Sequence, residues 1–466
     1  MLSPTKQQLT DKKRSKTLLI NDIRVVRYSE HVARPTKSPV VRSFVGTTPP
    51  EEHHPLRAQI RGVGYFNRIG PGIVTGAADD DPSGIGTYSQ IGATQGYRSL
   101  WVAPFLLPFA FSIQEACARI ALVTGEGLAR VIKRRFPAPI LYLMVSLVAI
   151  ANTVNIAADL SSMAAVIRMF IPLNQLTTVV LIAVLVALAE IVIPYHQYAR
   201  VLRWLCLSLL SYVVVLFVAN VNWSLVAAGL TSISISWTKT DISALIALAG
   251  TTISPYLFFW QAAEEMEEGL HAPDISVTHI HAMRGDVFAG MLSGVFVMFA
   301  IMTTTAATLF GTGLTNITSP EQAAAALRPI AGDFAGVIFA LGILGTGLLA
   351  VPVLAGSTAY AVSEAFGWRE SLERKPSQAK QFYAVIAASM IIALLLNLIG
   401  INPMQSLVMA AILNGVTAPI LMIVIWKISR DRQLLGEWTS AWWSSLLVGL
   451  GTLLMISLPI FWLFAR

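Results

Sequence analysis

The chain has 466 residues, of which 55% are apolar or aromatic and only 13% are Asp, Glu, Lys or Arg, and its mean hydropathy is +0.64. Soluble domains carry about 25% charged residues, so this composition excludes a string of soluble domains and predicts a polytopic membrane protein. The two cysteines, Cys117 and Cys206, exclude a disulfide framework. The sequence contains no phosphate-binding Gly-rich Lys motif and no nucleophile elbow, so it does not favour a pump or a hydrolase.

Residues 1–60 differ from the rest of the chain, because they are polar, rich in Lys and Arg and without helical apolar periodicity. No apolar core of a secretory signal follows their basic start. We therefore predict a disordered basic cytoplasmic tail that lies against anionic membrane lipids, with a regulatory arm as the alternative. Residues 61–466 are predicted to form one transmembrane domain of eleven helices.

Runs of 18 or more mostly apolar residues predict transmembrane helices. Eleven apolar segments follow the tail, at about 67–97, 99–123, 138–165, 175–193, 198–221, 241–268, 286–311, 331–363, 381–400, 403–427 and 440–464.

The basic residues are unevenly divided between the two sides of this arrangement. Lys and Arg crowd into and around the loops predicted to lie inside, at about 124–137, 194–200, 269–285, 364–380 and 428–439. The positive-inside rule then predicts a multi-pass protein of the plasma (inner) membrane with a cytoplasmic N-terminus and a C-terminus on the outer side. The net charge of +7 is explained by this topology, and no nucleic-acid partner is expected.

Two of the apolar segments are interrupted. The first is cut by Asp81-Pro82-Ser83-Gly84, and the sixth is cut near Gly250-Thr251-Thr252-Ile253-Ser254-Pro255. The two breaks correspond if helices 1–5 and 6–10 are two five-helix halves, and paired interruptions of this kind indicate the midplane site of a transporter. The freed backbone carbonyls must face protein or a water-filled cavity.

Three adjacent carboxylates, those of Asp79, Asp80 and Asp81, lie near the middle of the first segment. A carboxylate at that depth costs at least about 2.5 kcal/mol, so the three need water, a cation, a proton or a basic partner. One of them is expected to cap the half-helix that Pro82 opens. The functional interpretation is a cation site that uses Asp81 together with freed carbonyls.

A polar stripe runs along one face of the third helix and comprises Asn152, Asn155, Asp159 and Ser162. Interhelical hydrogen bonds and a water-lined path for ions or protons explain this stripe equally well.

After the second break, one helix face carries Tyr256, Trp260 and Glu264 and leads to an acidic helix end. This face either passes a released cation toward the cytoplasm or is simply a solvated helix end. In the second helix, the i, i+4 pair Glu115 and Arg119 is expected to be mutually neutralising and structural.

The seven histidines are predicted to lie in the tail, in loops or at helix edges, with His279 and His281 on the loop 269–285. The membrane core therefore lacks a histidine that could act as a pH switch. His279 and His281 could chelate a metal, but no partner ligand is evident.

Several motifs between residues 70 and 129 are separated by the same distances along the chain as in one known protein family. Among them are Gly70-Pro71-Gly72, Gly96-Tyr97 and Val123-Thr124-Gly125. Asp81-Pro82-Ser83-Gly84 stands where that family has Asp-Pro-Gly-Asn, and Asp159-Leu160 matches an Asp-Leu of its third helix. The sequence thus resembles the NRAMP family of divalent-metal transporters. The resemblance implies an all-α, LeuT-like (APC superfamily) fold of 5+5 inverted repeats plus an eleventh helix. It also implies that helices 1 and 6 are unwound at the midplane and hold a metal between them.

Carried over residue by residue, the resemblance implies a metal site formed by Asp81, Gly84, Thr251, Ser254 and Ala78. A second group along the transport pathway comprises Asp79, Asp80, Tyr256, Trp260, Glu264, Asn152 and Asp159. No catalytic residue and no cofactor are expected, because the divalent metal ion is the transported substrate.

Several residues depart from the family pattern at positions that bear on which metal ion is transported. The family's Met-Pro-His in helix 6 reads Ser254-Pro255-Tyr256, the Asn of Asp-Pro-Gly-Asn is Gly84, and an acidic residue of helix 3 is Asn152. Oxygen ligands suit Mg²⁺, Ca²⁺ or Mn²⁺ better than a thioether does, and Mg²⁺ keeps several of its waters. The pattern is therefore similar to that of the NRAMP-related magnesium transporters, and we expect cation entry without stoichiometric proton co-transport.

The leading prediction is a carrier of divalent cations, with Mg²⁺ and Mn²⁺ favoured, that works by alternating access. A proton-coupled Mn²⁺/Fe²⁺ transporter of the conventional NRAMP type and an organic-cation symporter on the same fold are the alternatives. A further alternative is a cation sensor that does not transport and that uses the tail as a signalling arm.

Overall fold

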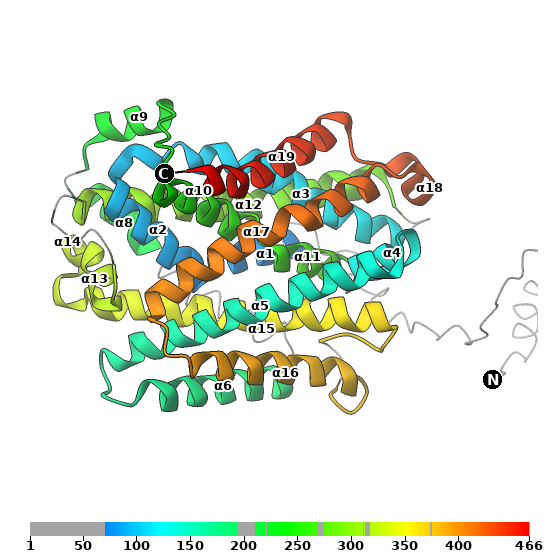
Figure 1. The fold of residues 1–466 in the computed structure, drawn as a ribbon, viewed down its shortest axis with the longest axis horizontal. Coiled ribbons are helices and arrows are strands. Elements are labelled where there is room, and N and C mark those ends of the chain that lie inside the picture. The colour runs from blue at the N-terminus through cyan, green and yellow to red at the C-terminus, as the bar shows by residue number, and fades with distance from the viewer. Residues whose placement is uncertain are drawn as a thin grey trace, which may run out of the picture. The chain divides into compact units, whose positions relative to one another are not determined.

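The computed structural model describes residues 70–193, 210–219, 221–267, 275–310, 312, 317–372 and 375–465. The predicted tail of residues 1–60 lies outside the described residues. Within them, the chain is helical throughout and is joined by short loops (Figure 1).

Eight helical spans of the described residues are long and apolar enough to cross a membrane. They are α3 (Val102–Thr124), α5 (Ala138–Arg168), the pair α10 (Lys239–Thr252) and α11 (Pro255–Glu267), α12 (Val277–Thr308), α15 (Ala335–Phe366), α16 (Lys380–Asn397), α17 (Pro403–Ser429) and α19 (Trp442–Phe464). The remaining apolar segments contain α1 (Pro71–Asp79) with α2 (Pro82–Gln95), α6 (Gln175–Val192) and α8 (Leu210–Val218). Each predicted segment therefore contains helix within the described residues, and for the fifth segment these begin at Leu210.

Both predicted interruptions are present and are short. α1 gives way to α2 across Asp80 and Asp81, and α10 gives way to α11 across Ile253 and Ser254. A proline opens each following half-helix, where its missing N–H would have had no intrahelical partner. The second break is narrower than the sequence indicated, because α10 remains helical through Thr252.

Short helices occupy several of the connections: α4 (Leu128–Arg135), α9 (Trp223–Thr231), α13 (Pro320–Ala324), α14 (Arg328–Ala331), α18 (Arg432–Leu435) and the 3-10 turns η2 (Gly96–Ser99), η4 (Ala325–Leu327), η5 (Gly332–Phe334) and η6 (Gly436–Trp438). Three of them, α4, α18 and η6, lie within segments that the sequence indicated as plain loops.

The loop predicted at 269–285 is wrong in its second half, because α12 already begins at Val277. A capping box starts the helix there: Ser276 Oγ accepts from the His279 backbone N–H, and the His279 ring accepts from the Ser276 N–H. His279 and His281 therefore lie on the first turns of a helix and not on a loop.

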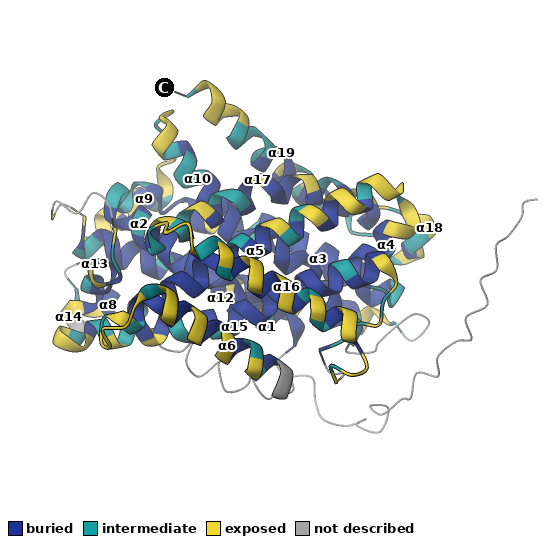
Figure 2. Cartoon of the chain, turned by 60° about the horizontal axis from the view of Figure 1, so that its bottom comes forward, coloured by how far each residue is buried: buried dark blue, intermediate teal, exposed yellow. Residues whose placement is uncertain are grey.

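The helices form layers around a buried centre. α5 lies beside α15, α6 and α16 cover them on the outside, and α1, α11 and α12 lie in the middle (Figure 1). Figure 2 shows exposed residues along the outward faces of α6, α16 and α19. Many are large and apolar, such as Leu185 and Leu188 of α6. An exposed apolar surface of this extent marks contact with membrane lipid.

α1 and α12 pack backbone against backbone through glycines. A Cβ added at Gly290 would lie 1.9 Å from the Gly72 carbonyl oxygen, and one added at Gly76 would lie 2.3 Å from the Gly290 oxygen. Small residues allow such close approach between membrane helices. The Asp286 carboxylate of α12 also accepts from the Gly72 N–H at 2.5 Å, so α12 holds the N-terminal end of α1.

A buried charge network ties three helices together. Glu115 of α3 pairs with Arg119, as the i, i+4 spacing predicted. It also accepts from Arg284 of α12 at 2.8 Å and from the Ser444 hydroxyl of α19 at 3.2 Å. The last helix is thereby fixed to the bundle by polar contacts, which sequence spacing alone could not indicate.

Candidate metal site

Asp81 caps the half-helix that follows the first break. Its Oδ1 accepts from the Gly84 N–H and from the Ser83 hydroxyl, both at 2.7 Å, and the side chain is buried. A carboxylate at a helix N-terminus satisfies free N–H groups and interacts favourably with the helix dipole. The structure confirms that one of the three adjacent carboxylates is a cap.

Asp79 and Asp80 are also buried but are placed differently. Asp79 Oδ1 and Asp80 Oδ1 have no hydrogen-bond partner in the part of the chain that the structure describes. Asp79 turns toward α12, where its Oδ2 lies 3.1 Å from the Cβ position of Gly294. Among the described residues, no group of three or more His, Cys, Asp or Glu side chains could hold a metal ion.

At the second break, Ser254 closes the end of the preceding half-helix. Its hydroxyl donates to the carbonyl oxygens of Gly250 and Thr251, both at 2.8 Å. The Thr251 hydroxyl is buried without a partner among the described residues, and its oxygen lies 3.2 Å from the Cβ position of Gly84. The predicted residues Gly84 and Thr251 therefore face each other.

A direct hydrogen bond joins the two breaks. The Tyr256 hydroxyl of α11 donates to the Ala78 carbonyl of α1 at 2.8 Å. Tyr256 is fully buried, and its own carbonyl accepts from Ser357 of α15 at 2.9 Å. The Ala78 carbonyl, a predicted ligand, is thus paired with the side chain that stands where the family has His.

The polar stripe of α5 meets the first break through Asn155. Its amide nitrogen donates to Asp81 Oδ2 at 2.7 Å and to Asp159 Oδ2 at 3.2 Å, and its oxygen accepts from Asn414 of α17 at 3.2 Å. Asn152, one turn earlier, donates instead to the Leu354 carbonyl of α15 at 3.1 Å. The structure therefore brings Asp159 into the site and turns the amide of Asn152 away from it.

Trp260 and Glu264 continue from Tyr256 along α11. The Trp260 ring is buried and forms an edge contact with Tyr360, with ring centroids 6.4 Å apart. Glu264 lies one turn further and is half-buried. Both therefore remain in the predicted pathway set.

The site residues predicted from the sequence did not include three contributors: Ser83, Asn155 and Asn414. Asn155 belonged to the recognised stripe, and a lone Asn in the apolar α17 is itself a signal of an interior contact. Ser83 gave no such signal, because only the local fold brings its hydroxyl to Asp81.

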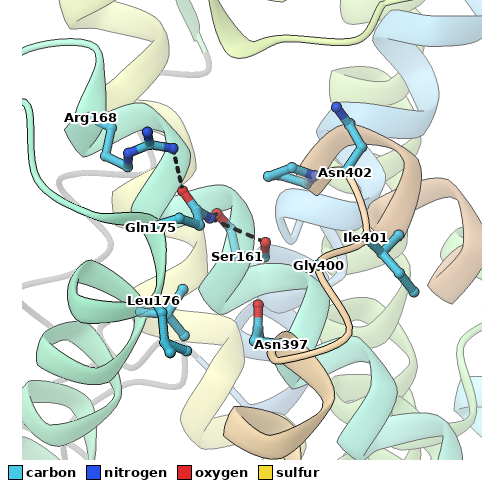
Figure 3. A pocket seen from close by; sticks show the side chains of 10 residues that line it. Ser161, Arg168, Gln175, Leu176, Asn397, Gly400, Ile401 and Asn402 are labelled. Carbon is cyan, nitrogen blue, oxygen red and sulfur yellow. Dashed lines mark hydrogen bonds between the residues drawn. The ribbon is translucent and has the colours of Figure 1, made fainter.

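A cavity of about 280 Å³ lies elsewhere, among the ends of α5, α6, α16 and α17. Figure 3 shows Arg168 bonded to Gln175 and Gln175 bonded to Ser161 along its wall, at 3.0 and 2.9–3.3 Å. It contains none of the predicted ligands, so it is not the metal site.

Two broken helices that face each other inside a lipid-exposed helical bundle define a multi-pass membrane transporter. A sequence model of the Nramp family, described as natural resistance-associated macrophage protein-like, matches residues 72–465. The chain belongs to the NRAMP family, a family of divalent-metal transporters, and is not an enzyme.

Individual relatives agree with this assignment. The chain is 25% identical over 404 residues to the divalent metal cation transporter MntH of Pectobacterium carotovorum subsp. carotovorum (strain PC1), covering 84% of this chain and 93% of that protein. It is 25% identical over 384 residues to the protein of the same name from Klebsiella pneumoniae (strain 342), covering 80% and 88%.

Solved structures confirm the predicted LeuT-like fold. A crystal structure of the Eremococcus coleocola manganese transporter superposes with a TM-score of 0.68 at 15% identity, covering 85% of this chain and 87% of that one. Mhp1, a nucleobase-cation-symport-1 family transporter, superposes with a TM-score of 0.56 at 12% identity, covering 86% and 93%.

Proposed function

We propose that the protein carries Mg²⁺ and Mn²⁺ across the membrane by alternating access, as in the NRAMP-related magnesium transporters. The observation that carries this proposal is the chemistry at the two breaks. Every candidate ligand there is an oxygen: the Asp81 carboxylate, the Thr251 hydroxyl and the Ala78 carbonyl. Such ligands suit hard divalent cations.

The residue at position 254 also supports a site for hard divalent cations. Ser254 is short, and its hydroxyl is turned onto the end of α10, so no side chain from this position reaches across to Asp81. At Gly84, a Cβ would lie only 3.2 Å from Thr251 Oγ1, so a side chain there would crowd the hydroxyl. Mg²⁺ sheds its waters reluctantly and is bound through few protein ligands, so a site that offers the Asp81 carboxylate and no long side chain from position 84 or 254 suits a partly hydrated Mg²⁺.

The charge distribution supports an inward orientation for the end that carries α4 and α18. Arg130 of α4 pairs with Glu370 at 2.6 Å, and Arg135 pairs with Asp431, so the basic connections of the chain gather at one end. We propose that this end is cytoplasmic, by the positive-inside rule.

Alternating access requires contacts that can be released at the opposite end. There the segment that leads into α13 rests on two other elements. Gln90 of α2 accepts from the Ile317 N–H at 2.7 Å, and Asn402 donates to the Thr318 carbonyl at 2.9 Å. Among the described residues, these two hydrogen bonds hold residues 317–318 against α2 and the start of α17, and we propose that their release opens that side.

A proton-coupled Mn²⁺ transporter is the second candidate. It is favoured by a second buried carboxylate, Asp159, which lies beside the site and can itself bind a proton. The relatives named divalent metal cation transporter and manganese transporter also favour Mn²⁺ as a substrate.

The test uses the purified full chain in liposomes and measures uptake of Mg²⁺, Mn²⁺ and Ca²⁺ beside calorimetric binding of the same ions. We expect binding and uptake of Mg²⁺ and Mn²⁺ by the wild type. Asp81→Asn should lose both while remaining folded. If the wild type neither binds nor transports Mg²⁺, the proposed substrate is wrong, and Mn²⁺ uptake alone would favour the second candidate.

A further inference from the structure

The Asp81 carboxylate is almost fully engaged by protein donors. An ionised carboxylate has about four lone-pair sites, two on each oxygen. Oδ1 accepts from the Ser83 hydroxyl and the Gly84 N–H, and Oδ2 accepts from the Asn155 amide, all three at 2.7 Å. Both sites of Oδ1 are therefore used, and one site remains, on Oδ2.

We infer that Ser83 and Asn155 determine cation specificity by restricting Asp81 to a single coordinating lone pair, on Oδ2. This inference rests on the proposed function, in which Asp81 is the anionic ligand. A bidentate carboxylate would need one lone pair from each oxygen, and Oδ1 has none left. Asp81 is therefore a monodentate ligand.

Monodentate binding discriminates among hard divalent cations. Ca²⁺ takes six to eight oxygens in flexible geometry and frequently binds carboxylates through both oxygens, whereas Mg²⁺ requires a near-octahedral shell and keeps several waters. A single lone pair leaves the rest of the shell to water and to small ligands such as Thr251 Oγ1. The arrangement favours Mg²⁺ and denies Ca²⁺ the bidentate contact.

The two residues contribute in different ways. The Gly84 N–H belongs to the helix start and would be present with almost any sequence. The Ser83 hydroxyl is an additional donor that a glycine, the residue of the family motif at this position, could not supply. Ser83 therefore removes the second lone pair of Oδ1.

Asn155 positions the carboxylate. Its NH₂ group faces two carboxylates and its oxygen faces the Asn414 NH₂, so a flip of the amide would set its oxygen against both acids and its NH₂ against another donor. The orientation of the amide is thereby fixed. Asp81 is held from α5 and cannot rotate to present Oδ1 to a cation.

The experiment compares Ser83→Ala with the wild type by calorimetric binding of Mg²⁺ and of Ca²⁺ to the purified full chain. Alanine is well tolerated in a helix, so the variant should fold. Loss of a hydrogen bond to a charged group frees one Oδ1 lone pair, and we expect the ratio of Ca²⁺ to Mg²⁺ affinity to rise by about tenfold. Ser83→Thr keeps the hydroxyl and should keep the wild-type ratio.

Ser112→Ala is the matched control. It removes an equally buried hydroxyl from α3, where the acceptor is the Pro108 carbonyl of the same helix. This control should leave the affinity ratio unchanged. Infrared difference spectra of metal binding give an independent readout, because the carboxylate bands of the wild type should shift as a monodentate ligand does and those of Ser83→Ala as a bidentate one does.

The outcomes separate the inference from the proposed function. If the wild type binds Mg²⁺ and Asp81→Asn does not, but Ser83→Ala keeps the wild-type ratio, the inference is wrong and the function stands. If Asp81→Asn binds Mg²⁺ as the wild type does, Asp81 is not the ligand and both fail. If the Ser83→Ala protein is unstable, Ser83→Gly replaces it, because glycine also removes the hydroxyl that occupies Oδ1. Ser83→Gly should raise the Ca²⁺ to Mg²⁺ ratio, and an unchanged ratio would overturn the inference.

Discussion

Tyr256 and Ala78, which are 178 positions apart in the chain, are joined by a hydrogen bond of 2.8 Å from the phenol hydroxyl to the backbone carbonyl. The bond connects the half-helix after the second break to the half-helix before the first. It also occupies a lone pair of a carbonyl that is a candidate ligand, so the donor and a cation compete for the same group.

Tyr256→Phe tests this competition. The variant removes the hydroxyl and keeps the ring, so we expect cation affinity to stay the same or rise a few-fold. Loss of the hydrogen bond should lower the stability of the metal-free protein by about 1 kcal/mol. Calorimetric titration and thermal unfolding in the same detergent measure the two effects. Loss of cation binding would instead make the Tyr256 hydroxyl itself part of the site.

Ser254→Met tests the selectivity of the second break. The substitution removes the two hydrogen bonds to Gly250 and Thr251 and places a polarisable sulfur at the second break, beside the proposed cation site. We expect Mg²⁺ uptake to fall more than Mn²⁺ uptake, and Cd²⁺ binding to improve, because sulfur prefers softer ions. Uptake of the three ions is compared in one liposome preparation. An unchanged ratio of Mg²⁺ to Mn²⁺ would show that position 254 does not control selectivity.

Proton movement is the third measurable quantity. Asp81 and Asp159 are connected through the Asn155 amide, which keeps its hydrogens and does not pass them on. We expect Mg²⁺ uptake without stoichiometric acidification of the liposome lumen, as reported by an enclosed pH-sensitive dye. Acidification that follows metal uptake in the wild type and disappears in Asp159→Asn would contradict this expectation.

Glu115→Gln tests the buried charge network. Removing the carboxylate leaves the buried Arg119 without its ionic partner, and such a loss costs about 3–5 kcal/mol. A large fall in thermal stability in detergent is therefore expected. Glu126→Gln is the control, since its pair with Arg134 is partly exposed at 3.1 Å and should be worth less than about 1 kcal/mol. Equal effects of the two variants would be inconsistent with a structural role for Glu115.

The link between α4 and α18 should depend on salt and only weakly on pH. The hydrogen bond from Arg135 lowers the pKa of Asp431. The stability it contributes is therefore fully present above the ordinary Asp pKa of about 3.9 and is lost only as pH falls through the lowered value. Asp431→Asn should cost less than about 1 kcal/mol, unchanged between pH 5 and 8 and smaller at high salt. A cost that varies across that pH range would point to a different partner.

Local patterns predicted the helical spans and the two breaks. Pro82 and Pro255 mark the first residue of each following half-helix, and the length of each apolar run predicts a membrane-spanning helix. Both signals depend only on residues that are close together in the sequence. The start of α12 also has a local signal, the capping box of Ser276 and His279. However, the N3 position of this box is His279, where Glu or Gln is usual. The predicted loop was wrong for that reason.

The composition of the site depended on distant contacts and could be predicted only in part. Asp81 was predicted from its depth and its place beside Pro82, whereas the approach of Asn155 to Asp81 spans 74 positions and results from helix packing. Asn152 and Asn155 fall on one stripe, yet one faces α15 and the other faces the break. A difference of three residues along a helix turns the side chain enough to change its neighbour.

The glycine contact between α1 and α12 has a mechanical consequence. No side chain lies between the two backbones at Gly72, Gly76 and Gly290, so no rotamer change can absorb sliding of one helix past the other. The pair moves as one body, and the pivot that remains for α1 is the non-helical joint of Asp80 and Asp81. The proposed ligand and the pivot are then the same residue, so a cation bound by Asp81 would stiffen the joint about which the half-helix must turn.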